Sequence, residues 1–278
     1  MVENTANADP LVPVKKPSSR RWFRFSLRTM LVAITLFCIW LGVTANRANR
    51  QRTAVETIRS YRAYVRYDYE IADNGWEVRR NNPPPPGPVW LRNLIGIDYF
   101  ATAVNVSMDH GNDVNDDSIS ALAELSQVRR IDIEGANVTD AVMAKLKGLK
   151  QLRELIVINS SITESGWEFL GHLTRLRNLA LYGSNVTDST LIHIEGLTEL
   201  TSLTIHESQI TDAGLSHLKG LAQLEYLELH DPLITDSSLQ HLKVLTGLKQ
   251  LDIRWTKITS DGISELKRAL PKLMVGAL

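Results

Sequence analysis

The sequence predicts an α/β protein: a right-handed solenoid with a parallel β-sheet on its concave face and helices on its convex face, preceded by one transmembrane helix. Two observations support this prediction. From residue 114 to residue 257 the chain repeats every 24 residues without a gap. Before the repeats, an uncharged apolar run from Met30 to Ala45 follows a basic stretch. Stacked units of this length share one continuous core, which is the property that defines a solenoid.

The charge of the chain is distributed unevenly, although the 278 residues have a formal net charge of zero. Residues 1–52 contain nine lysines and arginines against two acidic residues, so the remainder is net acidic. A basic stretch before an apolar run indicates a membrane, whereas an acidic repeat region argues against nucleic acid as a partner. The single cysteine, Cys38, lies within the apolar run, which excludes intrachain disulfides and cysteine-based metal sites.

The N-terminal region is predicted to hold the protein at a membrane. Residues 1–24 form a disordered basic cytoplasmic tail, and residues 25–45 form a helix just long enough to span a bilayer. More positive charges precede the helix than follow it, so the repeats are expected on the extracytoplasmic side. The helix is either a signal anchor or a signal peptide, because the small residues at Val43 to Ala45 also resemble a cleavage site.

The segment between membrane and repeats is predicted to cap the solenoid. Residues 46–82 contain a helix, with apolar residues on one face, and then an alternating strand from Tyr64 to Glu70. Solenoids need atypical end units to cover their core. Residues 83–89 form a stiff, Pro-rich spacer, for which a Pro-rich recognition ligand is the alternative. The repeat domain follows at 90–278, with a degenerate unit at 90–113, full units at 114–257 and a C-terminal cap at 258–278.

The fifth unit shows how each repeat is expected to fold. Thr211 and Asp212 provide a helix N-cap. The side chains that follow form an apolar helical stripe and then change to the alternating spacing of a short strand. The stripe comprises Leu215, Leu218 and Leu221, and the strand contributes Leu224, Leu227 and Leu229. One unit cannot bury its own stripe, so neighbouring units must stack.

The unit ITDAGLSHLKGLAQLEYLEL resembles the ribonuclease-inhibitor-like group of leucine-rich repeats, in the variety common in bacterial membrane and secreted proteins. The N-terminal FSLRTMLVAITLF and the WLRNLIG after the spacer resemble the same bacterial group. The resemblance implies a protein- or ligand-recognition role. The chain departs from the family where LxxLxLxxN has its asparagine, so a partial row of hydroxyl groups is expected instead. That place holds Ala136, Ser160, Ser184, Ser208, Pro232 and Thr256.

Candidate binding residues lie on the predicted concave face, where side chains differ from unit to unit. One column should contain Tyr182, His206, His230 and Arg254, because equivalent places of adjacent strands are neighbours. The adjacent positions add three further candidates: Tyr226, Glu228 and Asp252. Aromatic and arginine side chains among mixed polar residues are typical of binding hot spots.

Histidines provide the alternative to simple recognition. His206 and His230, with Glu228, could form a metal or acid–base cluster. A second column on the outer helices could in principle hold a metal, although such a column also follows from copying a repeat; it comprises His193, His217 and His241. The chain has no P-loop, HExxH motif, nucleophile elbow or Gly-rich dinucleotide turn.

These observations together predict a membrane-anchored extracytoplasmic protein that binds an unknown protein or envelope ligand through its concave face. No catalytic residue, cofactor or bound metal is expected, and nucleic acid is not an expected partner. A structural scaffold of the cell envelope is the alternative function. A metal-dependent enzyme using His206 and His230 is the third candidate.

Overall fold

The computed structural model of the chain describes residues 27–72, 83–108, 116–135, 138–158, 161–183 and 185–276, without the side chains of 116, 141 and 142. It divides into two compact units, residues 1–43 and residues 44–278. The predicted tail at 1–24 lies outside the described residues.

The long first helix, α1 (Leu27–Ser60), contributes to both units. Up to Val43 it exposes large apolar side chains. By length and composition it could cross a membrane, a test that a signal sequence also passes. From Thr44 onward the helix belongs to the second compact unit, residues 44–278, and buries one face. The helix continues without a break through residue 45, where the sequence predicted the end of the transmembrane segment. The buried face comprises Ala48, Gln51, Ala54, Val55 and Ile58.

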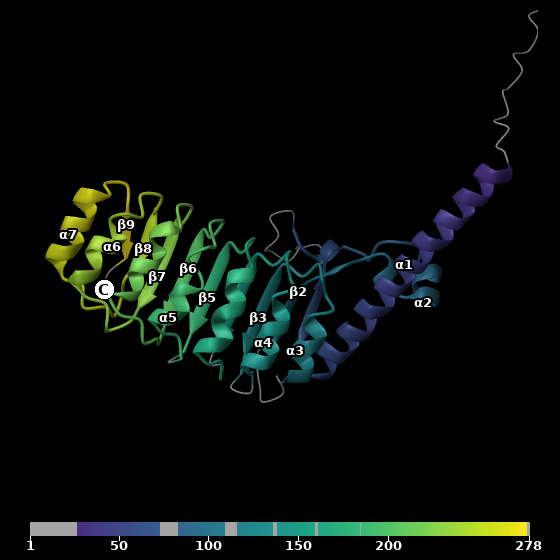
Figure 1. The fold of residues 1–278 in the computed structure, drawn as a ribbon, viewed down its shortest axis with the longest axis horizontal. Helices are drawn as coiled ribbons and strands as arrows, with labels where there is room; N and C mark the ends of the chain where they lie inside the picture. Colours follow the sequence, from purple (N-terminus) through teal and green to yellow (C-terminus); the bar gives the residue numbers. More distant parts are fainter. Residues whose placement is uncertain are drawn as a thin grey trace, which may run out of the picture. The chain divides into compact units, whose positions relative to one another are not determined.

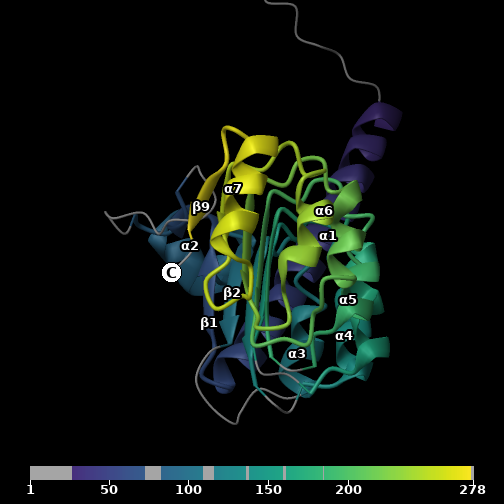
Figure 2. The ribbon, with the colours of Figure 1, turned by 90° about the vertical axis from the view of Figure 1, so that its left-hand side faces the viewer.

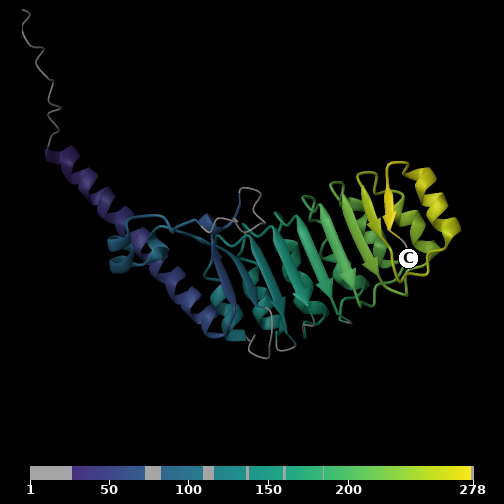
Figure 3. The same ribbon diagram turned by 180° about the vertical axis from the view of Figure 1, so that it is seen from behind.

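The second unit is built on one sheet whose strands follow one another in chain order from β1 to β9. Only β1 and β2 pair antiparallel among the described strands, and all later pairs are parallel (Figure 3). The strands are β1 (Tyr64–Tyr67), β2 (Ala103–Met108), β3 (Arg130–Glu134), β4 (Glu154–Ile158), β5 (Asn178–Tyr182), β6 (Ser202–His206), β7 (Tyr226–His230), β8 (Gln250–Asp252) and β9 (Met274–Gly276).

The register of the sheet follows the period of the sequence. In every pair from β3 to β9, each residue faces the residue 24 positions further along, as Leu179 faces Leu203 and Leu203 faces Leu227. Equivalent places of successive units are therefore direct neighbours. This parallel sheet with its repeating register is the architecture of a leucine-rich-repeat solenoid.

The helical layer covers one face of the sheet, and the other face, called here the open face, carries no helix of the repeats (Figures 1 and 2). The helical segments are short, and several are 3₁₀ helices, because a 24-residue unit must also contain a strand and two turns. They are α3 (Asp116–Leu122), α4 (Asp140–Leu146), η3 (Glu164–His172), α5 (Asp188–Ile192), η4 (Gly214–Gly220), η5 (Asp236–Ser238), α6 (Leu239–Leu242) and α7 (Ser260–Ala269).

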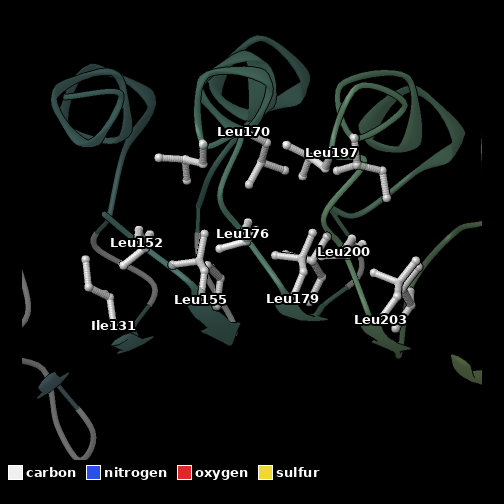
Figure 4. Close-up of a cluster of buried hydrophobic side chains, with 14 of the residues drawn as sticks. Ile131, Leu152, Leu155, Leu170, Leu176, Leu179, Leu197, Leu200 and Leu203 are labelled. Carbon is white, nitrogen blue, oxygen red and sulfur yellow. The ribbon is translucent and has the colours of Figure 1, made fainter. Parts of the chain in front are cut away.

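The core lies between the two layers and is continuous from unit to unit. Each unit contributes the same helix-side and strand-side leucines, which form parallel rows (Figure 4). In the fifth unit the six leucines predicted from the spacing are all at most 1% exposed. This burial agrees with the predicted phase of the repeat, since a shift by one residue would place strand leucines on the open face.

Aspartate–threonine pairs join successive units at four of the turns that follow the strands, and they are called here the ladder. The Asp188 carboxylate accepts hydrogen bonds from the Thr211 backbone N–H and hydroxyl, both at 2.7 Å. Asp212 and Thr235 repeat this arrangement, and so do two further pairs, Asp140 with Thr163 and Asp236 with Thr259. The sequence predicted only an N-cap within one unit, and Thr235 and Thr259 do cap their own helices.

Of the partial hydroxyl row expected at the family's asparagine place, the structure describes only Ser208 and Thr256, which are separated by Pro232 and so are not neighbours. Ser208 donates to Asp231 of the next unit at 2.6 Å, whereas Thr256 donates to the carbonyl of Ile253 in its own unit. Ala136, Ser160 and Ser184 lie outside the described residues. Contacts between units at this turn therefore vary along the solenoid.

The residues before the repeats form the first end of the sheet. The predicted strand from Tyr64 stops at Tyr67, where the turn η1 (Asp68–Glu70) begins. Residues 83–88 form no helix or strand, and the helix expected after them is α2 (Val89–Ile95), followed by η2 (Ile97–Tyr99).

Two glycines provide a matched test of the ladder. A Cβ added at Gly214 would lie 2.1 Å from the Asp188 carboxylate that holds Thr211, whereas a Cβ at Gly196 meets no atom within 4 Å. We expect Gly214→Ala to cost about 1–3 kcal/mol, as overpacking does, and Gly196→Ala to stay within about 1 kcal/mol of the wild type. Chemical denaturation of the detergent-solubilised full chain measures both; equal effects would contradict the role given to the ladder.

Candidate functional site

Three aromatic side chains lie side by side on the open face because the register aligns them. Tyr182 pairs with His206 across β5 and β6, and His206 pairs with His230 across β6 and β7. The tyrosine ring meets the first imidazole edge-on, with 4.9 Å between ring centroids. The two imidazoles stack at 4.0 Å with only 20° between their planes. The sequence predicted this part of the column.

The fourth member of the column is a tryptophan and not the arginine that the sequence predicted. The Trp255 ring packs edge-on against His230, at 4.8 Å between centroids. The Arg254 side chain turns back to Asp252, with its Nε 3.0 Å and its Nη2 2.8 Å from the carboxylate. The expected alternation fails because β8 ends at Asp252 and the chain turns there. We call Tyr182, His206, His230 and Trp255 the ring column.

The backbone at Trp255 is unusual for a bulky residue. The equivalent place in the turn after the strand has a positive φ in four units, at Gly135, Gly183, Glu207 and Trp255, and two of these residues are glycines. Trp255 has φ +61° and leaves 72% of its surface exposed. A bulky residue in this region costs about 1–3 kcal/mol, and such strain is concentrated at functional sites. The turn thus holds a strained, exposed indole at the end of the ring column.

Two carboxylates flank the ring column. Glu228 accepts a hydrogen bond from the Tyr226 hydroxyl at 2.6 Å. Its other oxygen lies 3.0 Å from Nε2 of His206 and 3.4 Å from Nε2 of His230. His230 Nε2 donates to Asp252 at 2.9 Å. All seven residues proposed from the sequence thus belong to one group of neighbouring side chains, with Trp255 as an eighth.

Burial and neighbouring charges set the protonation of this group. Burial, with the adjacent His230, lowers the pKa of His206, so this imidazole is neutral at pH 7. Burial and the bond to Glu228 raise the pKa of the Tyr226 hydroxyl. Burial would raise the pKa of Asp252, but hydrogen bonds from Arg254 and His230 outweigh it and lower this pKa to about 2. The surface at neutral pH thus combines aromatic rings with carboxylates.

A metal shared by the two histidines is the chemical alternative. One ligand atom each from His206, Glu228 and His230 lies within 4.8 Å of the other two. However, a metal–imidazole bond lies in the plane of its ring, and the two nearly parallel rings cannot both point at an ion between them. His230 also uses its Nε2 to bind Asp252. Both rings would have to turn before an ion could bind, so the present arrangement fits recognition better.

The outer-helix histidines do not form a comparable group. His217 Nδ1 lies 2.5 Å from Glu195 in the preceding unit, which is a contact between neighbouring units. Within the part of the chain that the structure describes, His193, His217 and His241 do not gather as a set of metal ligands. Their recurrence follows from the repeat.

A second polar cluster lies near the first end of the open face and was not predicted. Arg130 donates to Asp132 and, at 2.9 Å, to Glu154. Burial raises the pKa of Glu154, although Arg130 opposes this effect. Beside the cluster lies a cavity of about 240 Å³, lined by Tyr64, Arg66, Ile71, Asn105, Val106, Ser107, Arg130 and Asp132. The repeat pattern could not reveal this cavity, because the antiparallel β1 contributes part of the lining.

Known proteins resemble the chain only distantly. No protein-family model and no curated protein matches it. An internalin C2 from Listeria monocytogenes shares 20% identity over 65% of this chain and 82% of its own, with a TM-score of 0.47. A second internalin of that organism, inlF, shares 20% identity over 58% of this chain and 65% of its own, with a TM-score of 0.35. At this level of similarity, neither internalin indicates what this chain does.

The electrostatics of the ring column and its two flanking carboxylates can be tested at Asp252. Because the pKa of Asp252 is lower in the folded protein, its carboxylate stabilises the fold above the ordinary carboxyl pKa of 3.8, and this contribution is lost as pH falls towards 2. Arg254→Met should raise the pKa of Asp252 towards its ordinary value in a side-chain carboxyl NMR titration. Arg177→Met, which removes an ion pair with Glu199, should leave it unchanged; no shift in the Arg254 variant would contradict the assignment.

Proposed function

We propose that this protein is a membrane-anchored extracytoplasmic binding protein that recognises a protein or envelope ligand through the ring column and its carboxylates on the open face. The observation that carries this proposal is Trp255, a 72% exposed indole in a positive-φ turn, packed against a stack of rings from three strands. Exposed aromatic residues beside charged ones are the side chains that dominate binding energy at interfaces.

The group is ordered before any partner arrives. Tyr226 and His230 already donate hydrogen bonds to Glu228 and Asp252, and each ring of the column packs against the next. Side chains fixed in this way lose little conformational entropy on binding, which favours affinity. Packed rings and hydrogen-bonded carboxylates suit a recognition surface better than a site where groups must exchange protons.

The charge of the surface favours a partner segment with cationic side chains. Glu228 and Asp252 supply two carboxylates, and Arg254 is the cation bonded to Asp252. Because the lowered pKa of His206 favours a neutral imidazole, a lysine or arginine of the partner would complement the Glu228 carboxylate beside it. The Trp255 ring, which packs against His230, can add a cation–π contact to such a side chain.

Membrane attachment is proposed from α1 and its flanking charges. Its apolar side chains up to Val43 are exposed, as lipid-facing side chains would be. The excess of basic residues before them favours an extracytoplasmic repeat region. Cleavage near Ala45 would release the same region to the same side, so both alternatives lead to one location for the open face.

Substitutions on the two faces test where recognition occurs. Replacing Tyr182, Tyr226 and Arg254 together with alanine should lower the affinity for a partner isolated with the wild-type chain at least 100-fold, because hot-spot truncations cost about 2 kcal/mol or more each. Replacing His193, His217 and His241 together should leave the affinity unchanged. Circular dichroism checks that both variants fold. Loss of binding only in the second variant would move the site to the helical face.

Protease treatment tests the location. Protease added to intact spheroplasts should digest the repeats, because the charge bias places them outside the cytoplasmic membrane. A cytoplasmic protein in the same cells should stay protected. Protection of the repeats together with that control would reverse the proposed orientation.

A further inference from the structure

Helix α2 (Val89–Ile95) exposes an apolar face, which is unusual for so short a helix beside a folded domain. Val89 is 61% exposed, Trp90 68% and Leu94 73%. Trp90 and Leu94 are four residues apart and therefore lie on the same side of the helix. Leu91, Arg92 and Ile95, on the opposite arc, are partly buried. One side of α2 is thus partly buried against the protein, and the other side exposes apolar side chains.

The segment that follows α2 is fixed to the part of α1 that belongs to the repeat unit. Gln51 of α1 is 7% exposed, and its amide donates to the Ala101 carbonyl and the Asp98 carboxylate, both at 2.9 Å. The Gln51 carbonyl accepts from the Ala103 backbone N–H at 3.1 Å. These three hydrogen bonds hold residues 98–103 beside α1 at the height of Gln51.

Gln51 lies close to the point where a membrane-spanning α1 would leave the bilayer. The uncharged run ends at Ala45, and six further residues of helix rise by about 9 Å to Gln51. The polar layer on each side of a bilayer is about 5–8 Å thick. Arg47 and Arg50, between these two points, are exposed, as residues facing anionic headgroups would be.

We propose that the exposed face of α2 lies in the interfacial layer of the same bilayer that holds α1, with Trp90 and Leu94 inserted beside the lipid headgroups. The inference rests on the proposed membrane anchor. Tryptophan prefers this layer because its ring is apolar while its N–H can bond to water and headgroups. A second contact with the lipid would prevent the whole repeat region from rotating about α1. It would therefore fix the direction in which the open face points relative to the membrane.

Spin labels on the full chain in vesicles of phosphatidylcholine and phosphatidylglycerol test this proposal. Cysteine is introduced singly at Trp90, at Leu94, at Leu36 in the apolar part of α1, and at Val244, after replacing the only native cysteine (Cys38→Ser). Val244 is a matched control, because it is an exposed apolar residue of the sixth repeat unit, at 54%. Power saturation then compares the accessibility of each label to oxygen, which partitions into lipid, and to a water-soluble nickel complex.

We expect the labels at positions 90 and 94 to show an oxygen-to-nickel accessibility ratio several-fold higher than that of the label at position 244. Labels at 90 and 94 that match 244, while the label at 36 reports lipid, would overturn the inference and leave the anchor standing. A label at 36 that is also in water would overturn the anchor itself, and the inference with it. Because positions 90 and 94 are both exposed, neither substitution removes a core contact.

Discussion

The pairing of each residue with the residue 24 positions further along is the constraint on which the rest of the structure depends. It places leucine beside leucine in the core and Asp188 beside Thr211 in the turn. On the open face it places imidazole on imidazole. Since successive strand residues point to opposite faces, a shift of one residue would exchange core and surface. Core, turns and binding surface therefore share one register.

The same register explains why the candidate site extends over several units. Each unit adds one to three side chains to the candidate site, so an extended surface arises without a long loop or a deep pocket. His206 and His230 come from adjacent strands but pack like residues within one side-chain cluster. Trp255 closes the ring column by leaving the regular backbone, at a cost in conformational energy. The regular part of the fold thus supplies order, and one irregular turn supplies the most exposed contact.

Much of this arrangement could be predicted from the sequence, because periodicity alone determines which residues share a face. The buried leucines and the alignment of Tyr182, His206 and His230 follow from the repeat. The position of Trp255 just beyond the last strand is evident from the sequence, but its packing against His230 could not be predicted, since counting along an ideal strand continues to Arg254 and ignores the turn. The hydrogen bonds that Thr211 donates to Asp188 of the preceding unit were not predicted, because a Thr-Asp pair is also typical of a helix N-cap within one unit. The cavity depends on an antiparallel strand outside the repeat.

Photo-crosslinking in native membranes tests the central claim most directly, that the partner contacts the open face. A photoreactive phenylalanine analogue is placed in the full chain at Tyr226, beside the ring column, or at Lys219, an exposed residue of the helical layer. We predict a discrete crosslinked product from position 226 that disappears when Glu228→Ala is added, and none from position 219. A product from position 219 alone, unaffected by Glu228→Ala, would contradict the account.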